Sequence, residues 1–209
     1  MHAVRRGGGL LAAGPLSADP LNRLSADFQN STSLGGGTEI ATNLAPPGIL
    51  VYTKSVVPID RTTGQPLQTL YVTFSAQADV HNGSALLMTA TVNGQFCQPL
   101  LGETAGGGTT FPNWYTLLRL PAPTTGTNCN DGGGGTADCH DNVISFTCCA
   151  HIGIVPPTPE GSSPGVPVNI RLADLPGGDV NTAFYERSTI YIDAVSDPNN
   201  KLCAGHRMP

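Results

Sequence analysis

The sequence has few charged residues and no long apolar run. Asp, Glu, Lys and Arg make up 12% of the 209 residues, and Lys occurs only at Lys54 and Lys201. A protein that tracks the phosphates of nucleic acid needs clustered Lys and Arg, whereas this chain has scattered arginines and a net charge of −5. No segment approaches the ~18 continuous apolar residues of a transmembrane helix. We therefore expect no nucleic-acid partner and no membrane span.

Motifs for catalysis and for zinc binding are also missing. No serine stands in a Gly-x-Ser-x-Gly elbow, and no His and Asp pair has the spacing of a catalytic triad. His140, Cys148, Cys149 and His151 lack the spacing of paired zinc ligands. The sequence therefore favours a protein that is not an enzyme, and a hydrolase is the remaining enzymatic alternative.

Glycine and proline are abundant, with 26 Gly and 18 Pro in the chain. This share, roughly one and a half times the usual one, opposes long helices and favours short strands joined by turns. The length suits a single all-β unit. We predict one β-sandwich of jelly-roll or immunoglobulin-like type, with about eight or nine strands and long loops at one end. A closed barrel is the alternative.

Apolar residues that alternate with polar ones locate the expected strands. Asn82-Gly83 predicts a tight hairpin between two of them, and Asn93-Gly94 predicts a second hairpin. The glycine-rich residues 102–110 are expected to form a loop. The strands are expected at 48–57, 70–77, 85–92, 95–97, 114–120, 143–154, 166–172 and 188–195.

Residues 1–37 are expected to form an N-terminal arm, and residues 38–209 the sandwich domain. Leu21, Leu24 and Phe28 have helical spacing, so a turn or two of helix docked on the domain is the favoured interpretation of the arm. The alternative is an extended segment that pairs with a neighbouring subunit, because apolar arms flanked by glycine are elements that assemblies exchange.

The six cysteines favour disulfides over reduced thiols, which indicates an extracellular or cell-surface protein. A reduced, cytoplasmic protein is the alternative. The apolar run within residues 5–14 is too short, and its surroundings are too rich in glycine, for a signal peptide. Export is therefore expected to use a signal outside this sequence. Asn30 and Asn82 begin Asn-x-Ser/Thr triplets and would be glycan acceptors.

Two adjacent cysteines suggest how four of the six pair. Cys148 and Cys149 lie in an expected strand, where neighbouring side chains point to opposite faces. Each should therefore reach a different partner, and Cys97 and Cys203 are available. We predict disulfides that join Cys97 and Cys203 to this vicinal pair.

Cys129 and Cys139 enclose a second glycine-rich segment, which contains Gly132 to Gly135. A disulfide between them would stabilise the fold by roughly 3 kcal/mol, so a stapled surface loop is the favoured interpretation. The alternative is a Ca²⁺ site, since Asp131, Asp138 and Asp141 offer carboxylates and Ca²⁺ takes six to eight oxygen ligands. The spacing differs from that of an EF-hand loop.

The leading hypothesis is a secreted, non-enzymatic structural protein. It would be a subunit of an extracellular filament, coat or appendage, attached to copies of itself by arm or strand exchange. The alternative is an adhesive, carbohydrate-binding module, with or without Ca²⁺, that binds cell-surface or matrix polysaccharide. In that case Trp114 and Tyr115 would form the platform on which sugar rings stack. No cofactor other than Ca²⁺ is expected.

Overall fold

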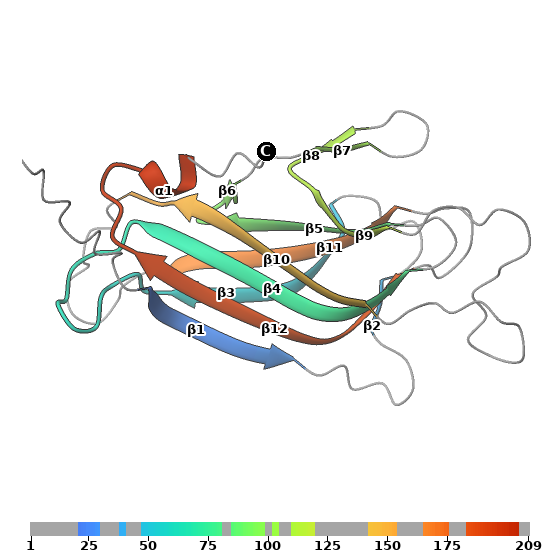
Figure 1. The fold of residues 1–209 in the computed structure, drawn as a ribbon, viewed down its shortest axis with the longest axis horizontal. Coiled ribbons are helices and arrows are strands. Elements are labelled where there is room, and N and C mark those ends of the chain that lie inside the picture. The colour runs from blue at the N-terminus through green and yellow to red at the C-terminus, as the bar shows by residue number, and fades with distance from the viewer. Residues whose placement is uncertain are drawn as a thin grey trace, which may run out of the picture.

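The protein is a sandwich of two antiparallel sheets (Figure 1). The computed structural model describes residues 21–29, 38–40, 47–80, 85–98, 102–104, 110–119, 142–153, 165–175 and 183–204. Their elements are β1 (Asn22–Gln29), β2 (Thr38–Ile40), β3 (Ile49–Val56), β4 (Thr69–Val80), β5 (Ala85–Val92), β6 (Gln95–Phe96), β7 (Gly102–Thr104), β8 (Thr110–Pro112), β9 (Tyr115–Arg119), β10 (Asn142–His151), β11 (Val166–Leu175), β12 (Ala183–Val195) and α1 (Lys201–Ala204). In the described residues no helix is long and apolar enough to cross a membrane.

The strand order is that of a jelly roll. Sheet A has the order β1-β12-β4-β10, with β2 also paired to β12, and sheet B has the order β3-β11-β5-β6, with β9 also paired to β5. β6 and β9 both pair with β5 and are counted here as one strand. β1 then pairs with β12, β3 with β11, β4 with β10, and β5 with β6 and β9. The pairs are thus nested from the two ends of the chain inward. Eight strands paired in this way in two sheets form a jelly roll. The predicted β-sandwich is therefore confirmed, and its topology is that of a jelly roll rather than that of an immunoglobulin-like domain.

The core lies between the sheets and follows the alternation of their strands. Leu70, Val72 and Phe74 of β4 point inward and are fully buried, and Ile170 and Leu172 of β11 face them from sheet B. Each such side chain contributes roughly 1.5–3 kcal/mol through removal of apolar surface from water. The core therefore fixes which face of each long strand remains outside.

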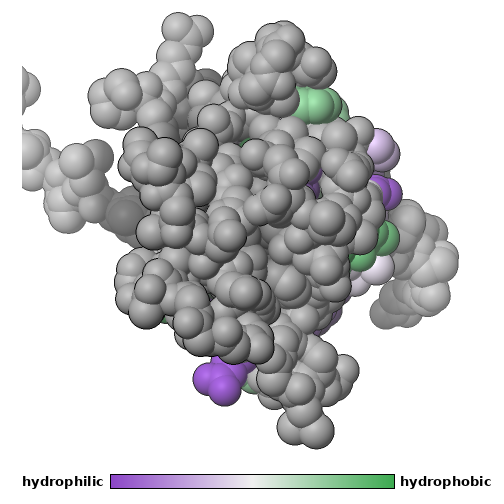
Figure 2. All heavy atoms as spheres, turned by 90° about the vertical axis from the view of Figure 1, so that its right-hand side faces the viewer, coloured by the Kyte–Doolittle hydropathy of each residue, from purple (hydrophilic) through white to green (hydrophobic). Residues whose placement is uncertain are grey.

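Three connections leave the sandwich at the same end. Val80 of β4 pairs with Ala183 of β12, while Ala85 of β5 pairs with both Arg119 and Leu175. The connections that follow β4, β9 and β11 therefore start together, as predicted for long loops at one end. Figure 2 looks onto this end, where the visible described residues form separate hydrophilic and hydrophobic spots.

One of the two predicted hairpins is wrong. β4 lies in sheet A and β5 in sheet B, so residues 81–84 connect the two sheets rather than two paired strands. The apolar residues of β5 fall on both of its faces, because it is a central strand whose outer side is covered by Trp114. The second hairpin is confirmed: Asn93 and Gly94 have φ of 52° and 76°, the left-handed pair that a type I′ turn requires between β5 and β6.

The helix expected from Leu21, Leu24 and Phe28 is wrong, because residues 22–29 form a strand. β1 pairs with β12 of the same chain, and its register shifts between Arg23 and Ser25. That bulge lets Leu24 pack against the core and also leaves Ser25 buried, so the apolar spacing mimics a helix. Sequence also missed the hairpin β7–β8 within the expected loop, and helix α1.

Candidate interaction face

The outer face of sheet A has an uncharged centre. Strands β1, β12, β4 and β10 lie side by side there, toward the viewer in Figure 1. Their registers align the outward side chains in cross-strand rows, and none of the side chains in the two central rows is charged at neutral pH. The first row is Phe28, Thr189, Ser75 and Ser145, and the second is Ala26, Tyr191, Thr73 and Thr147.

Hydroxyl groups in these rows bond to one another. Ser75 and Ser145 share a hydrogen bond of 2.8 Å between their Oγ atoms, and Thr73 and Thr147 share one of 2.8 Å between their Oγ1 atoms. A polar group costs free energy on burial mainly when it is left without a partner. Because each of these four hydroxyls already has one partner on the same face, a second surface that covers them leaves none of them without a hydrogen bond.

Apolar side chains stand exposed around the same face. Phe28 is 63% exposed within it, and Val143, in the row beyond Ser145, is 85% exposed. Leu21 and Leu202 are exposed at its other end. These are four of the seven exposed large hydrophobic residues described, so apolar exposure is concentrated on this side of the sandwich.

Two charges at one margin of the face neutralise each other. Arg23 donates a hydrogen bond from Nε to Asp193, its cross-strand neighbour, and its guanidinium lies 4.2 Å from the centre of the Tyr191 ring. An ion pair as exposed as this one stabilises the fold little. Its effect is to remove a net charge from the row beside Tyr191.

A groove of about 580 Å³ crosses the outer face of sheet A at the end where Leu21 and Leu202 lie. Thr73 and Thr147 lie on its strand side, and Leu202 lines it from α1. The described residues that line it are Leu21, Tyr71, Thr73, Thr147, Asp193, Val195, Ser196, Asp197, Pro198, Lys201 and Leu202.

Helix α1 is held against the outer face by a disulfide and a cap. Cys149, on the outer side of β10, bonds to Cys203, with 5.7 Å between their Cα atoms. The carboxylate of Asp197 accepts hydrogen bonds from the backbone N–H groups of Lys201 and Leu202, at 2.9 and 3.0 Å. Burial raises the pKa of Asp197, but these hydrogen bonds outweigh it and hold the pKa below its ordinary value.

One open edge of the sandwich is closed covalently. Cys97, just after β6, bonds to Cys148 on the inner side of β10, with 5.4 Å between Cα atoms. Next to it, Gln98 and Cys149 exchange two backbone hydrogen bonds of 2.6 and 3.0 Å. The two disulfides thus join Cys97 and Cys203 to the vicinal cysteines, which is the set of pairs that the sequence predicts.

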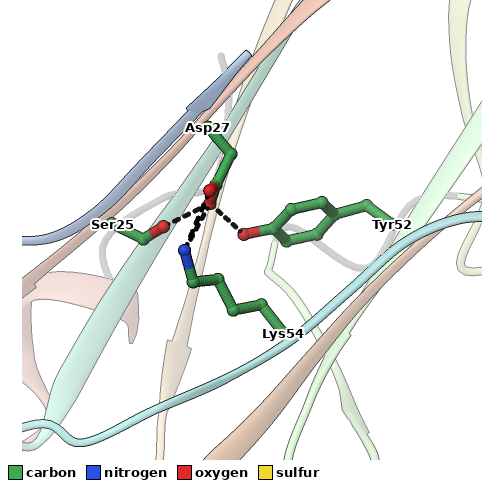
Figure 3. A network of polar contacts seen from close by, with 4 residues as sticks. All are labelled: Ser25, Asp27, Tyr52 and Lys54. Carbon is green, nitrogen blue, oxygen red and sulfur yellow. Dashed lines mark hydrogen bonds and ion pairs between the residues drawn. The ribbon is translucent and has the colours of Figure 1, made fainter. Parts of the chain in front are cut away.

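The other edge is closed by four polar side chains (Figure 3). Asp27 of β1 accepts hydrogen bonds from Ser25, from the Tyr52 hydroxyl at 2.6 Å, and from Lys54 Nζ at 2.8 and 2.9 Å. The hydrogen bonds from Lys54, Ser25 and Tyr52 lower the pKa of Asp27 to about 2. Burial, and then the bond to Asp27, raise the pKa of Tyr52. The network joins edge strands of opposite sheets, which is a structural role.

The predicted sugar platform is wrong. Trp114 is 5% exposed and packs against Ala85, Leu87 and Ala173, while Tyr115 is 3% exposed. The Tyr115 hydroxyl donates a hydrogen bond of 2.7 Å to the carbonyl of Cys97. Because both rings are covered, neither can present a face on which a sugar could stack.

The loop chemistry expected from sequence falls outside the described residues. The Ca²⁺ site, the third disulfide and the glycan acceptors therefore stay predictions. In the part of the chain that the structure describes, no group of three or more His, Cys, Asp or Glu is placed to hold a metal ion. The residues concerned are Asp131, Asp138, Asp141, Cys129, Cys139, Asn30 and Asn82.

The outer face itself was not recognised in the sequence, although part of its signal is present. Thr73 and Ser75 alternate with buried residues in one strand, and Ser145 and Thr147 do so in another. The sequence does not show that these strands are neighbours, because the paired residues are 70 and 74 positions apart and other strands intervene.

No protein-family model and no curated protein matches the chain. Two solved structures of infectious bursal disease virus match the chain at low TM-scores. The first is the VP2 subviral particle, with 12% identity and a TM-score of 0.40, where the match covers 96% of this chain and 39% of the viral one. The second is the structure of the Gt strain, with 14% identity and a TM-score of 0.38, where the match covers 94% and 37%. The chain thus spans less than two-fifths of either viral chain.

Proposed function

We propose that this chain is a structural subunit that assembles with copies of itself through the outer face of sheet A. The observation behind the proposal is the pair of central rows on that face, which are uncharged and in which four serine and threonine hydroxyls bond to one another in pairs. A sheet surface whose hydroxyls already have hydrogen-bond partners loses less when a second protein covers it than one whose hydroxyls bond only to water.

The face is also suited to contact with an identical face. Two copies related by a two-fold axis bring the same patch together, so a charge near the axis would meet its own copy. The central rows contain no charge, and Arg23 and Asp193 at the margin already neutralise each other. Phe28 and Val143 add exposed apolar surface that association would remove from water.

The finer parts of the proposal follow from the sequence. The disulfides support a secreted protein, and low charge with an N-terminal segment of 20 residues before Leu21 supports a filament, coat or appendage subunit rather than an enzyme. No observation now favours the carbohydrate-binding alternative, because Trp114 and Tyr115 are buried.

A matched pair of variants tests the proposal. Ser145 and Thr53 are both exposed, and each shares a 2.8 Å hydrogen bond with a side chain of the next strand, but Ser145 lies on the outer face of sheet A and Thr53 lies on sheet B. We expect Ser145→Lys to lower the weight-average mass measured by sedimentation equilibrium, since it places like charges in the interface. Thr53→Lys should leave the mass unchanged.

Two results would contradict the proposal. A native chain that stays monomeric at high protein concentration has no self-assembly to explain. An assembly that is equally sensitive to Ser145→Lys and Thr53→Lys would use some other surface. Electron microscopy of the native material would separately distinguish filaments from closed coats.

A further inference from the structure

The groove beside α1 crosses the strands of sheet A. It reaches from Leu21, at the start of β1, over the outward residues of β12, β4 and β10 to Leu202 of α1. Its volume of about 580 Å³ falls in the range of sites that bind small molecules or short peptide segments. The groove is therefore large enough for a short apolar segment.

The two acidic groups that line the groove already have partners. Asp193 accepts a hydrogen bond from Arg23, and Asp197 accepts the backbone N–H groups that begin α1. Most of the remaining lining is apolar or hydroxyl-bearing, with Lys201 as the free cation among the described lining residues. Such a surface suits an apolar segment better than it suits an ion or a strongly polar ligand.

The chain contains an apolar segment next to this site. Residues 1–20 precede Leu21 and contain Leu10, Leu11 and Leu16, separated by small residues and proline. Twenty extended residues span up to ~66 Å, which is enough to reach a neighbouring subunit. Their charges are two arginines and one aspartate, whereas the rest of the chain has eight basic and fourteen acidic side chains. The segment and the body of the protein are thus opposite in net charge.

The direction of the chain at Leu21 favours a neighbour over the same molecule. β1 runs along the strands, whereas the groove runs across them. The same chain would therefore have to turn sharply at Leu21 to enter its own groove, whereas the segment of a neighbouring copy can enter the groove along its length. We infer that the groove beside α1 binds residues 1–20 of a second copy of this chain.

This inference rests on the proposed self-assembly and is tested on the full chain. Leu202 is replaced by the photoreactive residue p-benzoylphenylalanine, and the assembled protein is irradiated. Leu50 is replaced in the same way as a control, because it is comparably exposed, at 48% against 44%, but belongs to sheet B. We expect position 202, and not position 50, to give a cross-linked dimer in which mass spectrometry finds residues 1–20 joined to residue 202.

A second substitution makes the expected result quantitative. Leu11→Asp changes the segment and leaves every described residue that lines the groove as it is. Loss of one buried leucine contact should weaken binding ~10-fold and lower the yield of cross-linked dimer accordingly. Cross-links from residue 202 to residues 1–20 of the same chain, or to other residues, would overturn the inference. If the protein is still assembled in that case, the proposed function stands and only the exchange of the segment fails.

Discussion

The hydroxyl of Tyr52 in β3 donates a hydrogen bond of 2.6 Å to the carboxylate of Asp27 in β1, and this bond connects the two sheets at one edge of the sandwich. At the other edge the connection is the Cys97–Cys148 disulfide. The two edges therefore differ in chemistry: one depends on protonation states and the other on oxidation.

The contact between Tyr52 and Asp27 should be visible in a double-mutant cycle. We expect Tyr52→Phe and Asp27→Asn each to lower the free energy of unfolding by about 1–2 kcal/mol, because each leaves a polar partner at the sheet edge without its hydrogen bond. The double variant should lose less than the sum of the two. Urea denaturation measures all three values, and strictly additive losses would show that the two groups do not interact.

The same carboxylate should make stability depend on acid pH. The pKa of Asp27 is about 2 in the folded chain against an ordinary value of 3.8, so its contribution is full above about pH 4 and is lost as the pH falls toward 2. The free energy of unfolding should therefore fall less steeply over this range in Asp27→Asn than in the native chain. Lys54→Met removes the main cause of the lowered pKa and should move the loss to higher pH. Identical slopes in all three proteins would contradict this.

An alkaline counterpart is expected from Tyr115. Burial raises its pKa to about 12, so its contribution to stability is full below pH 10 and is lost as the pH rises from about 10 to about 12. Tyr115→Phe should be less stable at neutral pH by about 1 kcal/mol, because the hydrogen bond to the Cys97 carbonyl is gone. It should also lose less stability above pH 10. Tyrosinate absorbance, followed with unfolding, distinguishes ionisation of this group from that of exposed tyrosines.

Loss of one disulfide should free helix α1, whereas loss of the other should not. The two disulfides close loops of similar sequence separation, 51 and 54 residues, so the chain-entropy model gives each about 4 kcal/mol. Replacement of Cys149 and Cys203 by Ala should in addition free α1, which hydrogen exchange at residues 201–204 would detect. Replacement of Cys97 and Cys148 should leave α1 protected. Equal exchange in the two variants would show that α1 is held by its cap alone.

Trp114 offers a direct check of the corrected sugar platform. It is the single tryptophan of the chain and is almost fully covered. Its fluorescence should resist quenching by acrylamide, shift to longer wavelength on unfolding and ignore added oligosaccharides. Trp114→Ala should cost about 3–5 kcal/mol of stability, as expected for a large side chain removed from a core. Strong quenching in the folded protein would contradict its burial.

Strand positions were predictable because local alternation determines them, as in β4 and β10. Pairing was not, because it depends on residues far apart: Ser75 meets Ser145 only once the jelly roll has formed. β1 failed for a related reason, since the bulge at Arg23 and Ser25 breaks the period of two on which a strand prediction relies. The prediction that Cys148 and Cys149 bond to different partners is confirmed, because adjacent side chains of any strand point in opposite directions.

Cys148 and Cys149 also restrict which misaligned registers of β10 the disulfides could stabilise. Cys148 points into the core to meet Cys97, and Cys149 points outward to meet Cys203. Exchange of the two partners would require β10 to slip by one residue, which would turn Ile144 and Phe146 out into water and bring Ser145 and Thr147 inside. A misaligned β10 therefore cannot be locked in place by the native cysteine partners without exposing its apolar side. The two native disulfides and a buried apolar side of β10 are therefore compatible with one and the same register.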